Sequence, residues 1–325
     1  MLPRFEYIKA ETVEEAIDQM KDKGSVLHAG GTDLLGCLRD GVFTTEKVIS
    51  IYSIKELSGI RENDDKTVYI GPLTTISDVE SNPLIRKRYP VIAKAASEVA
   101  SPQLRNRGTI GGNLCQKPRC WYYRGEFPCL RKGGKKCYAA GREDQNHCIF
   151  GGNRCFIVHP SDMAPALSAC DAKLKIKGPD RTISVSINDF FVLPEEEPTI
   201  ETILAKDEMI TGITLPPLKE NSIGVFRKVR ARRSWDFALA SLAAVFEFED
   251  NKINRANVYL GGAAPVPWRS EKTEKALEGK ELTPETISSA AEAVVKDAQP
   301  LRHNGYKIKL FRGIVKEELL HIIQK

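Results

Sequence analysis

Five of the eight cysteines in this 325-residue chain lie in one short segment, residues 119–155. Clustered thiols can form disulfides, bind zinc, hold an iron–sulfur cluster or be grouped by chance. The segment contains no C-x-x-C pair, whereas structural zinc sites often contain two. Its wide spacing, with aromatic residues and glycines between the thiols, suits a bulky cluster at least as well as a zinc ion. Spacing alone therefore leaves both kinds of site open. The five residues are Cys120, Cys129, Cys137, Cys148 and Cys155.

The same segment is strongly basic. Between Cys115 and Cys155 it has nine Lys or Arg against three acids, a surplus comparable with the +5 net charge of the whole chain. These cations could stabilise a reduced cluster, attract an acidic electron carrier, contact nucleic acid or form an ordinary solvated surface. Trp121, Tyr122 and Tyr123 could shield a cluster from water or simply pack the segment.

Composition indicates a folded protein with room for two or three domains, at 42% hydrophobic and 28% charged residues. A net charge of +5 is too small on its own to indicate nucleic-acid or membrane binding. The N-terminus lacks the apolar core of a signal peptide, and no stretch is apolar enough for a membrane span. We therefore expect a cytoplasmic protein, in which reducing conditions disfavour structural disulfides.

Hydrophobic patterning predicts the elements that position these groups. After Pro216 and Pro217 the pattern changes from mixed elements to an antiparallel meander followed by helices. Because strands and helices are partly segregated, an α+β fold is expected rather than a doubly wound parallel sheet. The expected helices are 12–23, 91–100, 283–297, 305–323 and a short one at the end of 67–82. The expected strands include a short one at the start of 26–35, which runs into a glycine turn, then 47–51, the start of 67–82, a hairpin over 172–185, and 208–217.

Two turns place paired glycines directly after apolar, strand-like residues: HAGGTDLL (28–35) and RGTIGGNL (107–114). Such turns present consecutive backbone N–H groups with no side chain in the way, which suits a pyrophosphate. Neither turn is a G-x-G-x-x-G or a Walker loop, so the usual nucleotide folds are not indicated. From the residues alone, each turn could equally be a tight connection between elements.

Five motifs, GGTDL, RNRGTIGGNL, HPSDMAPAL, MITGITLP and FRKVRARRSWDFALAS, are spread over essentially the whole chain. In this order and spacing they resemble the FAD-binding (medium) subunits of the xanthine oxidase family of molybdenum hydroxylases. The resemblance implies a two-subdomain FAD-binding domain of the vanillyl-alcohol-oxidase (PCMH) type over residues 1–217. It also implies a C-terminal α+β domain, an antiparallel sheet with helices, over residues 218–325.

The resemblance implies where FAD binds. The turn at 29–34 would hold the pyrophosphate, and the second turn would form another phosphate-side loop. Asp162 would hydrogen-bond the polar part of the flavin, Ile210 would pack against the flavin, and Lys228 would lie near the isoalloxazine. Without the family pattern, Asp162 would be a helix N-cap and Lys228 a solvated charge. The implied cofactor residues are Ala29, Gly30, Gly31, Thr32, Asp33, Leu34, Thr109, Gly112, Asn113, Asp162, Ile210 and Lys228.

In most of that family the second glycine turn leads quickly to the SD motif, but here Asn113 and Ser161 are 48 residues apart. The extra segment, at about residues 115–156, resembles the insert of 4-hydroxybenzoyl-CoA reductase β subunits and of some aldehyde oxidoreductase FAD subunits. In those proteins the insert binds a [4Fe-4S] cluster. Matching cysteine to cysteine implies Cys120, Cys129, Cys137 and Cys155 as ligands.

The remaining four cysteines are not expected to bind the cluster. The match leaves Cys148 as the spare cysteine of the segment, and Cys115 is expected to be a small filler beside the second turn. Cys37 and Cys170 lie in apolar contexts and are expected in the core. His147 and His159 are not required as ligands.

We therefore expect an oxidoreductase subunit that relays electrons between FAD and a [4Fe-4S] cluster, with no catalytic residues of its own for the substrate. The resemblance implies a large molybdopterin-binding subunit and a small subunit with two [2Fe-2S] clusters, in a dimer of heterotrimers. Ferredoxin or another electron carrier would be an outside partner, and nucleic acid would not. Two alternatives stay open: a self-standing FAD oxidoreductase with a structural metal, and a basic zinc-binding module that contacts nucleic acid, against which the flavin motifs count.

Overall fold

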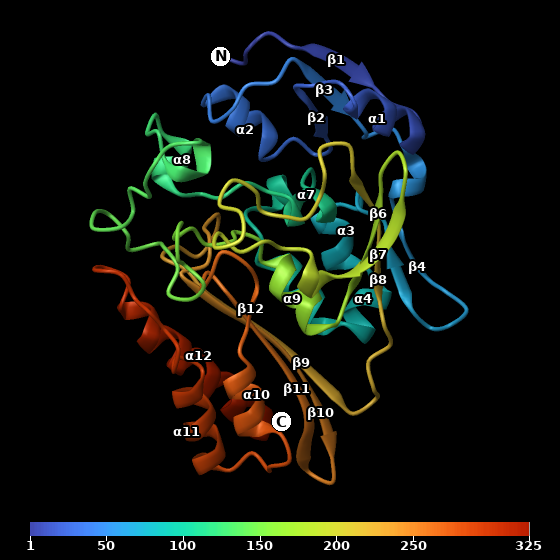
Figure 1. Ribbon diagram of the computed structural model, residues 1–325. Helices are drawn as coiled ribbons and strands as arrows, with labels where there is room; N and C mark the ends of the chain where they lie inside the picture. The colour runs from blue at the N-terminus through green and yellow to red at the C-terminus, as the bar shows by residue number, and fades with distance from the viewer. Residues whose placement is uncertain (325) are drawn as a thin grey trace.

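The computed structural model describes residues 1–324, which form three sheets and the helices around them (Figure 1). The strand orders are β1-β3-β2, β4-β5-β8-β6-β7 and β12-β11-β10-β9. The mixed architecture with an antiparallel C-terminal sheet confirms the expected α+β class. No helix in this range is both long enough and apolar enough to cross a membrane.

The N-terminal sheet is parallel and is built from β1 (Glu6–Lys9), β2 (Ser25–His28) and β3 (Lys47–Ser50). Helix α1 (Val13–Met20) packs its apolar face into the core beside this sheet. Thr12 caps α1, because its hydroxyl accepts the backbone N–H of Glu15 at 3.1 Å. The predicted helix over 12–23 and the strand over 47–51 are therefore confirmed.

The five-stranded sheet and its helices form the second unit. The strands pair antiparallel throughout, and the predicted hairpin over 172–185 is its β6–β7 pair. Helix α5 (Pro90–Ser97) fulfils the helix predicted over 91–100. The other elements are β4 (Ile60–Glu62), β5 (Val68–Ile70), β6 (Lys173–Lys177), β7 (Thr182–Ser186), β8 (Met209–Leu215), α3 (Ile76–Ser81), α4 (Pro83–Arg88), α6 (Pro102–Arg105), α7 (Ile110–Leu114) and α9 (Met163–Ala169).

The C-terminal sheet is covered on both faces. Ala243 and Val245 on β10 join the core that contains α5 and α9, whereas Leu242, Ala244 and Phe246 join a second core with the C-terminal helices. This alternation along one strand places the sheet between two helical layers (Figure 1). The elements are β9 (Ser222–Val229), β10 (Ala240–Glu249), β11 (Lys252–Gly261), β12 (Trp268–Arg269), α10 (Glu271–Leu277), α11 (Pro284–Ala293) and α12 (Tyr306–Ile323).

The cysteine segment has little regular structure of its own. It contains α8 (Trp121–Arg124) and the 3₁₀ turn η2 (Leu130–Lys132). Figure 1 shows α8 on the same side of the molecule as α2 (Leu34–Arg39), the short helix that follows the first glycine turn. The backbone of the segment pairs with itself at the bridge between Cys129 and Lys136, and contacts with other elements hold it in addition. The remaining 3₁₀ turns are η1 (Lys55–Leu57) and η3 (Ile187–Asp189).

Candidate functional site

The two glycine turns lie against each other. A Cβ added to Gly30 would stand 1.9 Å from the carbonyl oxygen of Arg107 and 2.8 Å from its carbonyl carbon. A Cβ on Gly108 would lie 3.5 Å from Oγ1 of Thr32. Turns that are far apart in the sequence therefore form one cradle, and glycine is required at position 30 because the backbone of the second turn fills the place of a side chain.

The first turn carries a row of free backbone donors. The N–H groups of Gly30, Gly31, Thr32 and Asp33 have no hydrogen-bond acceptor within residues 1–324. Gly31 has a φ of +73°, which helps to turn the chain here. Adjacent backbone donors that the protein does not satisfy form an anion-binding concavity. This cradle therefore fits the diphosphate of FAD.

The second turn uses its own polar groups internally. The hydroxyl of Thr109 accepts the N–H of Gly112 at 3.2 Å, and the carbonyl of Thr109 accepts the N–H of Asn113 at 2.8 Å. The side-chain oxygen of Asn113 accepts a hydrogen bond from the hydroxyl of Ser161. The structure thus brings the second turn to the SD motif, but it gives Gly112 a partner within the protein.

Asp162 and Lys228 form a buried ion pair. The Nζ of Lys228 donates to Oδ2 of Asp162 at 2.6 Å and to the carbonyl of Glu98 at 3.0 Å, and the two side chains are 0% and 6% exposed. Burial raises the pKa of Asp162, and the nearby Lys228 opposes that rise. Asp162 makes no side-chain cap bond to α9; Ser161 instead accepts the N–H of Ala164 at 2.9 Å. Asp162 thus stands at the N-cap position of α9 without capping it through its side chain, and the interpretation of Lys228 as a solvated charge is wrong.

We expect Asp162→Asn to lower the free energy of unfolding by about 3–5 kcal/mol, because it leaves the charge of Lys228 buried without its counter-ion. Urea denaturation of the flavin-loaded protein would measure the loss. The double variant Asp162→Leu/Lys228→Met removes both charges and should recover much of the stability. A single variant as stable as the parent would show that this pair does not contribute to folding.

Ala29, Leu34 and Ile210 are the apolar members of the predicted set, and Leu34 is the first residue of α2. Ile210 is 5% exposed and lies in β8 opposite Ile176. Its neighbour Met209 shares the N-terminal core with Ala29, so β8 passes close to the first turn. The structure therefore brings these parts of the predicted set into one region.

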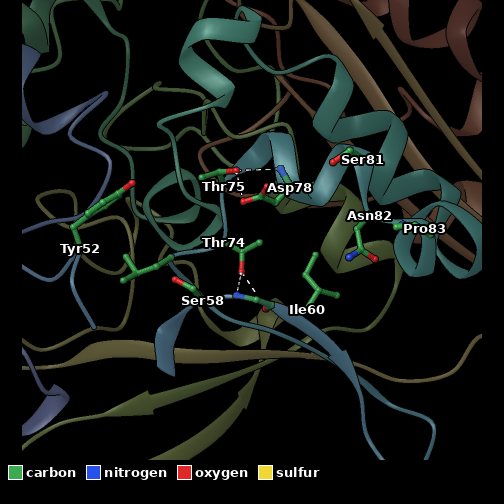
Figure 2. Close-up of a pocket in the computed structure, with 11 residues that line it drawn as sticks. Tyr52, Ser58, Ile60, Thr74, Thr75, Asp78, Ser81, Asn82 and Pro83 are labelled. Carbon is green, nitrogen blue, oxygen red and sulfur yellow. Dashed lines mark hydrogen bonds between the residues drawn. The ribbon is translucent and has the colours of Figure 1, made fainter. Parts of the chain in front are cut away.

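An open pocket of about 580 Å³ is lined in part by Thr75 (Figure 2). The backbone of Thr75 forms an isolated bridge with Thr109 of the second turn. Figure 2 shows hydroxyl and carboxylate groups around the pocket, with Asp78 bonded to Thr75. Tyr52 at its rim accepts a hydrogen bond from Arg107 at 3.3 Å. None of the predicted cofactor residues lines this pocket, so it adds nothing to their assignment.

The four nominated thiols are neighbours. A hydrogen bond from Cys155 lowers the pKa of Cys137 to about 6, and the same contact raises the pKa of Cys155. Burial raises the pKa of Cys120 to about 11, with smaller effects of Cys137 and Cys129. Within the described range, however, no three His, Cys, Asp or Glu side chains are arranged to hold a metal ion. A tetrahedral zinc ion would need four sulfurs about 2.3 Å from one centre. Among the described residues the structure therefore shows no preformed site for a zinc ion, and it shows none for an iron–sulfur cluster either.

The other thiols are packed by the protein. Cys37 and Cys170 are both 0% exposed, which confirms the expectation that they are core residues. Cys148 is also buried; its N–H donates to the carbonyl of Phe156 at 3.0 Å, and its carbonyl accepts from Asn304 at 3.0 Å. All eight cysteines are free thiols. Cys115 ends α7 and is half-buried.

Much of the basic charge in the segment neutralises acids elsewhere in the chain. Glu201, whose side chain is 5% exposed, pairs with Lys117 and with Arg131, which lies 2.6 Å away and is 2% exposed. Asp33 pairs with Arg119 at 2.9 Å and with Arg124 at 2.8 Å. These cations therefore fix the segment to the rest of the fold, which argues against a nucleic-acid surface.

The second half of the segment is fixed to the C-terminal domain. Asp144, 0% exposed, accepts the backbone N–H groups of Arg302 at 3.2 Å and His303 at 2.7 Å. Asn304 donates to the carbonyls of His147 and Cys148 at 3.1 and 3.0 Å. Sequence reasoning missed Glu201, Asp144 and Asn304, and no local motif could have found them, because their partners lie far away in the chain.

The three neighbouring aromatic residues of the segment differ in their exposure to solvent. Tyr122 and Tyr123 are buried, whereas Trp121 is 51% exposed. Tyr122 stacks on Tyr138 with ring centroids 6.1 Å apart. Two of the three aromatics are thus placed to exclude water from the thiols, and Trp121 is not. His147 lies 3.3 Å from the sulfur of Cys120 through Nε2.

Comparison with known proteins agrees with this arrangement. The family described as "FAD binding domain in molybdopterin dehydrogenase" matches residues 3–218, and the "CO dehydrogenase flavoprotein C-terminal domain" matches residues 225–322. The chain is 33% identical to the aldehyde oxidoreductase FAD-binding subunit PaoB of Escherichia coli strain K12, covering 94% of each chain. It is 30% identical to the carbon monoxide dehydrogenase medium chain of Hydrogenophaga pseudoflava, covering 98% of this chain and 96% of that one.

Solved structures show the same fold. Carbon monoxide dehydrogenase from Hydrogenophaga pseudoflava superposes with a TM-score of 0.78 at 28% identity, covering 98% of this chain and 96% of the other. Quinoline 2-oxidoreductase from Pseudomonas putida 86 has a TM-score of 0.78 at 20% identity, which supports the fold alone. The chain therefore belongs to the FAD-binding subunits of the molybdenum hydroxylases, a family of oxidoreductases.

Proposed function

We propose that this subunit passes electrons between FAD, a [4Fe-4S] cluster in the cysteine segment and the partner subunits of a molybdenum hydroxylase complex. The observation that carries the proposal is the row of four unsatisfied backbone N–H groups at Gly30–Asp33, on the same turn that fixes the cysteine segment through Asp33. Flavins exchange electrons singly or in pairs and iron–sulfur clusters singly, so the two together would connect one- and two-electron chemistry.

We propose the turn at 29–34 as the diphosphate site, with Thr109, Gly112 and Asn113 shaping its opposite wall. The buried pair of Lys228 and Asp162 would face the flavin end, where the ammonium favours negative charge on the ring. Ile210 would supply apolar contact. We also propose the domain limits 1–217 and 218–325, with the insert at about 115–156.

We propose Cys120, Cys129, Cys137 and Cys155 as the cluster ligands. Each ligand of a cubane binds a different iron atom, so its sulfurs lie farther apart than those around a single ion. The mutual effects of Cys120, Cys137 and Cys155 on one another's surroundings indicate that these thiols are neighbours, which supports a shared site. The burial of Tyr122 and Tyr123 would keep water away from it.

The partners that we propose are a large molybdopterin-binding subunit and a small subunit with two [2Fe-2S] clusters, assembled as a dimer of heterotrimers. The match to an aldehyde oxidoreductase FAD-binding subunit supports an aldehyde-oxidising complex, and a 4-hydroxybenzoyl-CoA reductase-like complex is the other candidate. Ferredoxin or another electron carrier would exchange electrons with the complex. Eight free thiols suit a reducing compartment, which supports a cytoplasmic location.

The test is to purify the native complex anaerobically and to measure iron, molybdenum, zinc and flavin for each copy of this chain. We expect one FAD and four irons on this chain, beyond the iron of the small subunit, and no zinc. If the complex contains FAD but no iron beyond that of the small subunit, the proposed FAD site is supported and the proposed [4Fe-4S] cluster is refuted. Zinc in place of iron, with strongly salt-dependent binding to nucleic acid, would favour the zinc module. Substrate-linked reduction of flavin by the isolated chain would favour a self-standing oxidoreductase.

Cys148→Ser should leave the iron content of this chain unchanged, because its backbone groups are bonded to Phe156 and Asn304 and its thiol is packed beside Gly152. Iron analysis and the visible spectrum of the anaerobically purified variant would check this. Loss of iron in Cys148→Ser, with iron retained when one of the four nominated thiols is replaced, would show that Cys148 is a ligand in the place of that thiol.

A further inference from the structure

The carboxylate of Asp33 is occupied by the cysteine segment. Its Oδ1 lies 2.8 Å from NH2 of Arg124 and 2.9 Å from NH1 of Arg119, and its Oδ2 accepts the backbone N–H of Lys117 at 2.7 Å. The side chain of Asp33 is 15% exposed, and these three partners all lie within residues 117–124. Its Oδ1 also accepts from the sulfur of Cys37 at 3.9 Å. Three charge-assisted or backbone hydrogen bonds in a largely buried place make a directional contact.

The backbone of the same residue belongs to the cradle. The N–H of Asp33 is one of the four donors without an acceptor in residues 1–324, whereas its carboxylate points to the segment. A ligand that fixes the backbone at 30–33 therefore also fixes the position of this carboxylate. Asp33 therefore connects the two sites, because its backbone belongs to the cradle and its side chain binds residues 117–124.

The partners of Asp33 extend this contact to other elements. Arg124 also donates to the sulfur of Cys37 in α2, at 2.8 Å, and to the carbonyl of Pro118, at 2.8 Å. The guanidinium of Arg119 lies 4.9 Å from the ring centroid of Phe237, in the segment that follows the strand of Lys228. Residues 117–124 are thus fixed between the first turn, α2 and the loop after β9.

We propose that Asp33 is a positioning residue, which couples FAD binding at the glycine cradle to the order of residues 117–124, the part of the insert that leads into Cys120. This inference rests on the proposed FAD site. Coupling between two sites is reciprocal. If FAD slows hydrogen exchange in residues 117–124 by a given factor, ordering of these residues therefore increases the affinity for FAD by the same factor. Asp33 therefore transmits the state of the cofactor site to the cysteine segment without contacting the flavin ring.

Hydrogen exchange followed by mass spectrometry tests the coupling on the full-length chain. Removal of FAD should speed exchange in residues 117–124 by on the order of tenfold, a typical size for coupling between sites. Asp33→Asn keeps the shape but removes the charge. In this variant, hydrogen exchange in residues 117–124 should be as fast as in the FAD-free parent, whether or not FAD is present. The affinity for FAD should fall by about the same factor of ten. The exchange of α12 should not change in either case.

Two controls separate the possible failures. Asp171→Asn makes the same chemical change at a carboxylate that accepts from Arg255 at 2.8 Å and Asn257 at 3.0 Å, away from the insert, and should alter neither measurement. Gly30→Ala, which blocks the cradle, should give the FAD-free exchange rate even when FAD is added. If Asp33→Asn keeps the dependence on FAD, the coupling is refuted and the cradle stands. If Gly30→Ala still binds FAD normally, both the cradle and the coupling are refuted.

Discussion

Gly30→Ala should abolish FAD binding while the rest of the chain stays folded. The new methyl group would stand 1.9 Å from the carbonyl oxygen of Arg107, a distance at which one of the two turns must move. Because the clash involves backbone on both sides, no side-chain rotation can relieve it. Separating the turns would break the row of donors at Gly30–Asp33. Flavin absorbance per chain after purification, and titration of the apoprotein with FAD, would measure the effect.

Gly36→Ala is the matched control for this variant. Gly36 lies in α2, six residues further along the chain, and a Cβ there would meet nothing within 4 Å. Alanine should be accepted and should raise helix stability by up to about 1 kcal/mol. Full flavin content and unchanged affinity in Gly30→Ala would contradict the assignment of the cradle.

Cys129→Ser should remove the iron–sulfur cluster and leave FAD bound. Serine has nearly the same size as cysteine, but its hydroxyl is a poor replacement for a thiolate ligand. Cys129 is 6% exposed and packs with Cys37, Val42 and Tyr123. The anaerobically purified variant should lose the broad brown absorbance of the cluster and about four irons per chain. Its flavin content should equal that of the parent.

Cys148→Ser again serves as the comparison, since both substitutions place a hydroxyl in a buried part of the same segment. Iron lost from both variants would indicate general disorder of the segment rather than a lost ligand. Full iron in Cys129→Ser would rule out this residue as a ligand and, with it, the proposed set of four.

The regular elements of this fold follow from the sequence because their information is local. The spacing of Val13, Ala16, Ile17 and Met20 predicts α1, and the Gly-Pro-Asp turn predicts the β6–β7 hairpin. Strands β1 and β4 and short helices such as α4, α6 and α10 were not predicted. The glycine turns could be found as possible anion sites from residue types alone. That they form a single cradle could not, because the contact between Gly30 and Arg107 depends on how two distant segments pack.

The electrostatic part of the site was beyond sequence reasoning for the same reason. Asp33 was predicted to contact the cofactor, yet its carboxylate is held by Arg119 and Arg124. A charged side chain in a sequence gives no sign of its partner when that partner is some ninety positions away. The pairing of Glu201 with Arg131 and the burial of Lys228 depend equally on tertiary structure.

The sheet that lies between two helical layers limits how this subunit can be divided. Phe226, Ala243, Val245 and Tyr259 of the C-terminal sheet belong to the same core as α5 and α9. A fragment that stops at residue 217 would expose that apolar face to water, and it would also lose the loop at 302–304 that holds Asp144. We therefore expect the flavin and C-terminal portions to unfold together, and chimaeras between related subunits should be joined elsewhere than at the Pro216–Pro217 break.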